Sequence, residues 1–85
     1  MRHYKDRLFQ PLLDALPPKI QALAQKNFKL LRRDPKHPSL HFKRIRDDLW
    51  SVRIGRNYRA LALEVDDDFR WFWIGPHDKY GKLIA

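Results

Sequence analysis

Apolar residues in the second half of this chain alternate with polar and charged ones, a period-two pattern that is typical of strands. The pattern predicts strands over residues 49–54, 58–65 and 69–75, with an earlier one over about 40–46. The connections Gly55-Arg56-Asn57 and Asp66-Asp67-Asp68 consist of residues that favour tight turns. We therefore predict an antiparallel meander in which short turns join successive strands.

The first half of the chain shows helical spacing instead. Apolar residues between Ile20 and Leu31 recur close to the helical period. They predict a helix from Pro18 to Arg33, because proline suits a first helical position and the residue before Pro35 avoids helical dihedral angles. A shorter helix is predicted over about 10–16, with extended residues before it.

These elements predict an α+β fold, with N-terminal helices packed on a three- or four-stranded antiparallel sheet. The 85 residues suit one domain, residues 1–85, because the chain is too short for a second core. After Gly75-Pro76 ends the last strand, residues 77–84 are predicted to form a helical turn that returns Leu83 and Ile84 to the core.

Alternation also predicts which side chains share a face of the sheet. Arg59 falls on a mainly apolar face of its strand, which a cleft beside Arg53 would explain. In the last strand both faces read as buried, so we expect an interior strand. Strict alternation in this strand puts two groups of residues on opposite faces of the sheet. One group is Trp71, Trp73 and Gly75, and the other is Phe72 and Ile74. The tryptophans are expected in the core rather than as platforms for bases.

Charge narrows the range of partners. Lys and Arg number 18 against 10 Asp and Glu, a formal net charge of +8, which favours an anionic partner such as nucleic acid, an acidic protein or anionic lipid. The absence of cysteine excludes disulfides and thiolate metal sites. No apolar stretch approaches the roughly 20 residues that span a bilayer, and no signal-peptide run follows the N-terminus. We expect a cytoplasmic protein without a membrane partner.

Several kinds of chemistry have no signature in this sequence. The four histidines form no metal-binding signature: His3, His37, His41 and His77. The glycines are isolated, so no phosphate-binding loop is present, and the two serines fall in no nucleophile motif. We therefore expect neither a metal nor another cofactor.

The residues that remain suit RNA cleavage without a metal. Arg53 and Arg59 are predicted to hold a phosphate through paired hydrogen bonds. His77 can donate or accept a proton near neutral pH, and Tyr80 is predicted to orient a 2′-hydroxyl or to act as a base beside cations. Further contacts to nucleic acid are expected from basic residues around them: His41, Lys43, Arg44, Arg56 and Lys79.

Four segments share an order known from one family. They are a helix end followed by a proline loop, a strand with a central arginine, a Tyr-Arg strand, and a terminal Ile-Gly-x-His-x-x-Tyr pattern: residues 31–40, 50–54, 58–61 and 73–80. Over roughly residues 16–84 the chain resembles the RelE/ParE toxin superfamily of bacterial toxin–antitoxin systems. The last pattern is the most specific part of this resemblance.

The resemblance implies a microbial-RNase-like α+β fold and a co-produced antitoxin that covers the toxin. It implies either cleavage of messenger RNA on the ribosome or, in the ParE branch, inhibition of DNA gyrase. Arg53 and Arg59 match strand positions that act on phosphate, and His77 and Tyr80 match C-terminal basic and aromatic positions. Ser51 stands where the best-known nuclease branch has a lysine.

Our leading hypothesis is a toxin that acts as a metal-independent endoribonuclease on ribosome-associated messenger RNA. A gyrase inhibitor and a non-catalytic nucleic-acid-binding module are the alternatives. An acidic, amphipathic antitoxin is the expected protein partner, because the basic side chains on one face of the predicted sheet would attract an anionic segment. The assembly is left open between a homodimer and a toxin–antitoxin heterotetramer.

Overall fold

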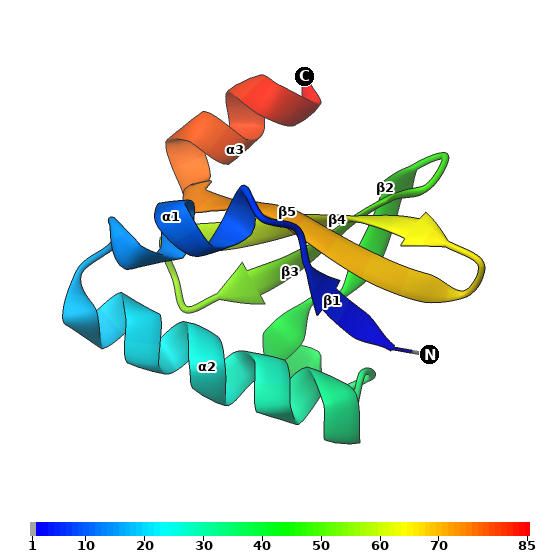
Figure 1. The fold of residues 1–85 in the computed structure, drawn as a ribbon, viewed down its shortest axis with the longest axis horizontal. Coiled ribbons are helices and arrows are strands. Elements are labelled where there is room, and N and C mark those ends of the chain that lie inside the picture. The colour runs from blue at the N-terminus through cyan, green and yellow to red at the C-terminus, as the bar shows by residue number, and fades with distance from the viewer. Residues whose placement is uncertain (1) are drawn as a thin grey trace.

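The computed structural model describes residues 2–85, which form one five-stranded sheet with helices on both sides (Figure 1). The elements in chain order are β1 (His3–Lys5), α1 (Phe9–Asp14), α2 (Pro18–Arg33), the 3-10 turn η1 (Pro38–Leu40), β2 (Lys43–Arg46), β3 (Leu49–Ile54), β4 (Tyr58–Val65), β5 (Asp68–Pro76) and α3 (His77–Ile84). The order of strands across the sheet is β1-β5-β4-β3-β2. Helix α2 runs along one side of the sheet and α3 lies over the other (Figure 1).

The predicted α+β class and most element boundaries are confirmed. Helix α2 begins at Pro18 and ends at Arg33, and β3 and β4 have the predicted limits. Strand β2 is shorter than predicted, because Pro38–Leu40 forms a 3-10 turn and His41 adopts a left-handed backbone with φ 44°. Residues in these conformations cannot continue a pleated strand.

The predicted sheet of three or four antiparallel strands is wrong in one respect. The N-terminal residues add β1, which pairs in parallel with β5, so that His3 lies beside Phe69 and Lys5 beside Trp71. The mixed sheet therefore has five strands. A strand of three residues is too short to show alternation in the sequence, and its partner lies more than sixty residues away.

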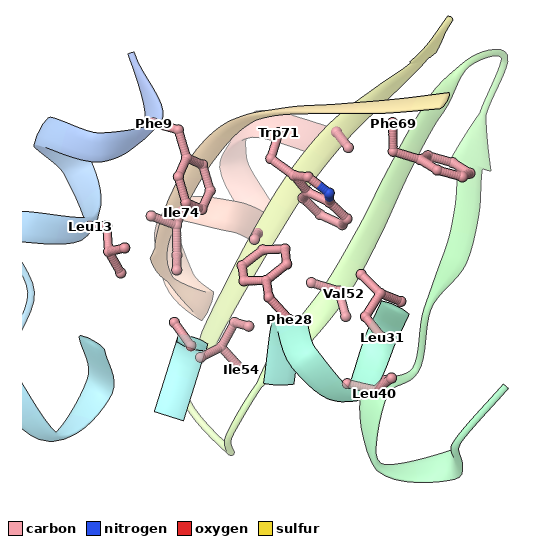
Figure 2. Close-up of a cluster of buried hydrophobic side chains, with 13 residues drawn as sticks. Phe9, Leu13, Phe28, Leu31, Leu40, Val52, Ile54, Phe69, Trp71 and Ile74 are labelled. Atoms are coloured by element: carbon pink, nitrogen blue, oxygen red, sulfur yellow. The ribbon is translucent and has the colours of Figure 1, made fainter. Parts of the chain in front are cut away.

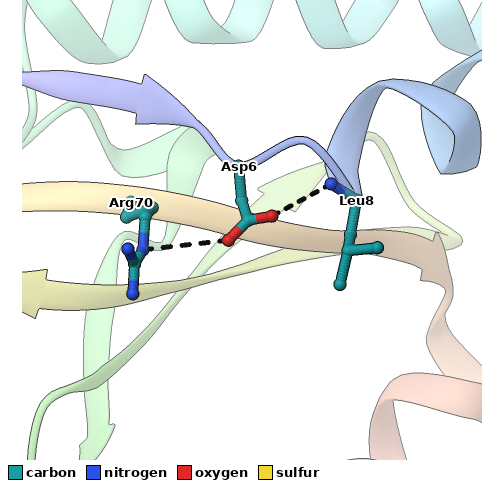
Figure 3. A network of polar contacts seen from close by, with 3 residues as sticks. All are labelled: Asp6, Leu8 and Arg70. Atoms are coloured by element: carbon teal, nitrogen blue, oxygen red, sulfur yellow. Dashed lines mark hydrogen bonds and ion pairs between the residues drawn. The ribbon is translucent and has the colours of Figure 1, made fainter.

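Asp6 links this strand to the first helix (Figure 3). Its backbone N–H donates to the carbonyl oxygen of Trp71 at 2.8 Å, and its carboxylate accepts from the Leu8 N–H at 3.0 Å. The same carboxylate lies 3.8 Å from Nε of Arg70. Because the Arg70 side chain is 55% exposed, this ion pair contributes little, and the bonds to backbone fix the turn.

A bulge in β5 overturns the strict alternation that we predicted for this strand. Trp71 pairs with Ala62 and Trp73 with Leu61, so Phe72 is an extra residue between two neighbouring positions of β4. A bulge shifts the side-chain pattern by one residue. Consequently Trp71 and Ile74 both enter the core beneath α2, instead of lying on opposite faces. The expectation that β5 is an interior strand is confirmed, because it lies between β1 and β4.

The core lies between the two N-terminal helices and one face of the sheet (Figure 2). Phe28 of α2 packs its ring edge against Trp71 at a centroid distance of 5.0 Å, and Phe9 of α1 packs on Phe28 at 5.8 Å. Ala60 and Ala62 of β4 are fully buried beneath these rings. Small side chains on the central strand leave room for the large aromatic ones, which supply most of the buried apolar area.

Helix α3 is anchored differently from our prediction. Its buried residue is Tyr80, whereas Leu83 is 51% exposed and Ile84 is half-buried. The predicted return of Leu83 to the core is therefore wrong. Tyr80 and Ile84 are four residues apart and share one face of the helix, while Leu83 falls to the side of that face. None of the helices in residues 2–85 combines the length and apolar character needed to cross a membrane.

A substitution at Gly75 tests how tightly the side chains pack at the end of β5. A Cβ at this position would lie 2.5 Å from Cζ2 of Trp73, so the indole would have to move. We expect Gly75→Ala to lower the free energy of unfolding by roughly 1–3 kcal/mol, the usual effect of overpacking. Gly81 is the matched control: an added Cβ meets no atom within 4 Å, and alanine favours the helix by up to about 1 kcal/mol. Denaturant unfolding of both variants checks this, and equal effects would contradict it.

His3 gives the fold a predictable dependence on pH. Its Nδ1 accepts a hydrogen bond from Nε1–H of Trp71 at 3.0 Å, and burial, followed by the charge of Arg32, lowers the pKa of His3 below its ordinary value. The unfolded chain therefore takes up this proton more readily, so stability is lost as pH falls below about 6.5. We expect His3→Asn, which keeps an acceptor for Trp71, to lose less stability than the wild type between pH 7 and pH 5. Identical pH profiles in thermal unfolding would contradict the assignment.

Candidate active site

The pairing of β3 with β4 sets Arg53 directly opposite Arg59. Opposed residues of antiparallel strands lie on the same face with their Cβ atoms about 5 Å apart, and like charges there destabilise the sheet. The pKa of Arg59 is lowered from its ordinary value by partial burial and then by the charge of Arg53, with Tyr80 acting in the opposite direction. A guanidinium stays charged at neutral pH even so. Two unneutralised cations held side by side produce a positive potential that attracts anions.

Both guanidinium groups are held in place by backbone carbonyls. Nε of Arg53 donates to the oxygen of Gly55 at 3.0 Å, and Nη1 of Arg59 donates to the oxygen of Tyr58 at 2.7 Å. Within residues 2–85 neither group has a carboxylate within 4.0 Å. An arginine offers five N–H donors, so most of them remain free for an external acceptor.

Helix α3 brings the other two predicted residues to the same end of the sheet. The Cζ atom of Arg59 lies 6.0 Å from the centroid of the Tyr80 ring, and the rings of Tyr80 and His77 are 5.7 Å apart. The N–H of His77 donates to the oxygen of Asn57 at 2.8 Å, which fixes the start of the helix beside the β3–β4 turn. Arg53, Arg59, Tyr80 and His77 therefore form a continuous series of neighbours.

Two of these four residues line different hollows. His77 is exposed and lines a hollow with Asn57 and Tyr58, whereas Arg53 lines a separate cleft against α2. Tyr80 is only 7% exposed, and its hydroxyl lies 3.3 Å from Oγ of Ser51 beneath the helix. With α3 docked, the Tyr80 hydroxyl is therefore turned towards the sheet.

The predicted auxiliary cations are spread over the surface. Lys43 lies opposite Ser51 and so shares the face of Arg53 and Arg59, while Arg44 lies opposite Trp50 and falls on the other face. Lys43 and Arg44 lie on opposite faces because successive side chains of a strand point to opposite sides of the sheet.

The remaining three auxiliary residues come from loops and α3. Arg56 lines the cleft of Arg53, and Lys79 is exposed on α3. His41 is exposed after η1 and lines neither the cleft of Arg53 nor the hollow of His77. His41 and His77 therefore do not line a common cleft.

Sequence reasoning missed the part of the site that α2 supplies. Lys26 and Asn27 line the cleft of Arg53, and Nδ2 of Asn27 donates to the Arg53 carbonyl oxygen at 3.0 Å. A signal was present, because Asn27 lies at helical spacing between Leu23 and Leu30 and so puts an amide on the apolar stripe of the helix.

A family profile described as the ParE-like toxin domain matches residues 18–82. The chain belongs to this family. The match includes α2, the sheet from β2 to β5 and most of α3, and so contains all four predicted site residues of this ParE-like toxin. The resemblance to the RelE/ParE superfamily is thereby confirmed. No curated protein matches the sequence significantly.

Solved structures of RelE proteins share the fold. A chain of the RelB–RelE antitoxin–toxin complex from Methanococcus jannaschii matches with a TM-score of 0.74 at 14% identity, over 96% of this chain and 99% of that one. A chain of the RelBE toxin–antitoxin complex from Mycobacterium tuberculosis gives 0.70 at 23% identity, over 89% and 96%. The RelE–RelB complex from Pyrococcus horikoshii gives 0.70 at 17% identity, over 88% and 92%. At these identities the likeness concerns the fold.

Tyr80 is expected to dock α3 through its ring rather than its hydroxyl. Tyr80→Phe keeps the ring beside Arg59 and removes only the bond to Ser51, so we expect stability to change by about 1 kcal/mol or less. Tyr80→Ala removes the anchor, and amide hydrogen exchange in α3 should rise by about tenfold or more while the core stays protected. Equal exchange in both variants would contradict this role.

Proposed function

We propose that this ParE-like toxin is a metal-independent endoribonuclease that cleaves messenger RNA and thereby inhibits translation. The observation that carries the proposal is the pair of guanidinium groups, Arg53 and Arg59, which face each other without a carboxylate partner in residues 2–85. A phosphodiester fits between them, because each arginine can donate two parallel hydrogen bonds to phosphate oxygens. The charge that grows on the phosphorus centre during cleavage would meet fixed donors there.

The reaction needs a base, a charge stabiliser and an acid. A base takes the proton of the 2′-hydroxyl, the 2′-oxygen attacks phosphorus, the bond to the 5′-oxygen breaks, and an acid protonates that leaving oxygen. The products are a 2′,3′-cyclic phosphate and a free 5′-hydroxyl. His77 is exposed and is connected to Arg59 through the Tyr80 ring, and it is the proposed proton-transfer group because an imidazole can both donate and accept a proton.

Tyr80 supports this arrangement from beneath. Its ring lies between Arg59 and His77 and limits the positions that both can take. A direct action of Tyr80 on the 2′-hydroxyl stays a prediction, because in the docked position of α3 its hydroxyl lies beside Ser51. Lys43, opposite Ser51 on the same face, is the nearest lysine along this strand pair to the position where the nuclease branch has one.

An acidic antitoxin is the proposed protein partner. The RelE structures to which this fold is similar are complexes with RelB antitoxins. The net charge of +8 favours an anionic segment that covers the cationic face and neutralises it. Ribosome-associated messenger RNA is the proposed substrate.

A second candidate function is inhibition of DNA gyrase. Two observations favour it: the matching family is ParE-like, and Ser51 stands where the nuclease branch has a lysine. In that case the arginine pair binds a protein or DNA surface and His77 does no chemistry. The two candidates predict different damage in the cell, because gyrase poisoning breaks DNA and leaves messages intact.

Expression of the chain without an antitoxin, followed by mapping of cuts in translated messages, tests the proposal. We expect Arg59→Gln to reduce cleavage by about 100-fold or more, as the loss of one stabilising donor does at comparable centres. Arg70→Gln is the matched control, because Arg70 is exposed on the neighbouring strand and lies outside the site. His77→Ala should also reduce cleavage by about 100-fold or more.

The outcomes separate the candidates. If DNA is broken while messages stay intact, and if His77→Ala leaves toxicity unchanged, the nuclease proposal is wrong and the protein is a gyrase inhibitor. Binding of RNA that falls steeply with salt, but without cuts, would identify a non-catalytic binding module.

A further inference from the structure

A cleft of about 570 Å³ borders the β3–β4 turn and shares no lining residue with the hollow of His77. It forms because β2 pairs with β3 only as far as Ser51, so the edge of β3 from Val52 to Ile54 has no neighbouring strand. Helix α2 and the loop before η1 stand on either side of this edge. Gly55, with φ +65°, keeps the turn close to α2, since a Cβ there would lie 2.6 Å from Cδ2 of Leu23.

The lining of this cleft has one sign of charge. Lys26, Arg53 and Arg56 line it, and none of its lining residues is acidic. Arg53 also belongs to the arginine pair, and its Nε is held by the Gly55 carbonyl. The cleft and the proposed active site therefore share one residue, Arg53. An anion with several charges could occupy both without a break.

The rest of the lining suits an apolar ring with polar edges. Leu23 and Leu30 of α2 are half-buried and contribute apolar surface. The Ser39 N–H donates to Nδ1 of His37 at 3.2 Å, so Nδ1 is an acceptor and the neutral imidazole carries its proton on Nε2. Asn27 uses its amide N–H on the Arg53 carbonyl and keeps Oδ1 free. Nε2–H of His37 and Oδ1 of Asn27 thus remain as a donor and an acceptor beside the apolar surface.

We propose that this cleft is a second nucleotide subsite, which holds the nucleotide next to the phosphate between Arg53 and Arg59; this rests on the proposed function. The base lies against Leu23 and Leu30, and the adjoining phosphate meets Lys26 and Arg56. Single-stranded RNA is recognised in this way, through unstacked bases in pockets and phosphates on cations. The volume is in the range of pockets that enclose a small ligand.

An RNA strand accounts better than an acidic peptide for the position of Arg53, which belongs both to the arginine pair and to the cleft. A nucleic-acid strand has a charge at every residue, so it can place one phosphate between Arg53 and Arg59 and the next beside Arg56. His37 Nε2–H and Asn27 Oδ1 then face the edge of the base and select among bases. The subsite would set which nucleotide flanks the cut.

The direct test is binding of a short RNA in which every 2′-hydroxyl is methylated, so that cleavage is blocked. NMR spectra of the full chain should show shifts of the Leu23 and Leu30 methyl groups and the Asn27 amide, together with Arg59. Lys26→Gln should weaken binding by about threefold to tenfold and lower the salt slope by about one. Lys19→Gln is the matched control, because Lys19 is exposed on the same helix and does not line the cleft; it should change affinity by less than about twofold.

A second readout concerns sequence preference. His37→Ala removes the donor from the cleft but leaves the arginine pair in place, so cleavage should continue with a relaxed preference for the base beside the cut. An unchanged preference in this variant, with the cuts still present, would overturn the subsite.

The remaining outcomes distinguish the subsite from the proposed function. Shifts at Arg59 and His77 without shifts at Leu23, Leu30 and Asn27 would overturn the subsite and leave the nuclease in place. Shifts in the cleft without cleavage of unmodified RNA would support the subsite and count against the nuclease. If a glutamate-rich peptide shifts the cleft residues and the methylated RNA does not, the cleft binds protein and the proposal is wrong.

Discussion

The bulge at Phe72 is the constraint on which the rest of this structure depends. It allows Trp71 and Ile74 to enter the same core, where Phe28 and Phe9 pack around them (Figure 2). Beyond the bulge, Gly75 of β5 lies opposite Arg59 of β4. Because Gly75 has no side chain, it leaves space for the Trp73 ring on the face of the sheet away from the core. Without the extra residue, either the core or the opposite face would be filled by the wrong side chains. One irregular position therefore fixes both the hydrophobic core and the surface on which α3 rests.

The packing of the core has to offset the repulsion between Arg53 and Arg59. Two like charges opposite each other on neighbouring strands destabilise the sheet, and in residues 2–85 no carboxylate relieves them. The buried aromatic packing on the other face offsets this repulsion and holds β3 and β4 in register. In the proposed function, a phosphate bound between the two guanidinium groups would relieve this repulsion. The free toxin is expected to gain stability when an anionic ligand or an acidic antitoxin binds.

The β3–β4 turn divides the functional surface into two parts. On one side the turn receives the start of α3, where His77 is bound to the Asn57 carbonyl. On the other side it meets α2 at Leu23 and borders the cationic cleft. Arg53 lines the cleft and Arg59 lies near Tyr80 of α3, so the arginine pair connects the two parts, and under the proposed function one strand of RNA would contact both.

The sequence by itself determined most of the elements and which residues are candidates for chemistry, because both depend on local patterns. Proline positions limited α2, alternation defined β3 and β4, and the rule that opposed strand residues share a face placed Arg53 near Arg59. The tertiary structure decided everything that depends on distant pairing. The parallel strand β1, the bulge at Phe72, the burial of Tyr80 instead of Leu83 and the contribution of Asn27 all follow from contacts between segments far apart in the chain. Patterns of period 2 and 3.6 describe single elements, and they carry no information on which elements will meet.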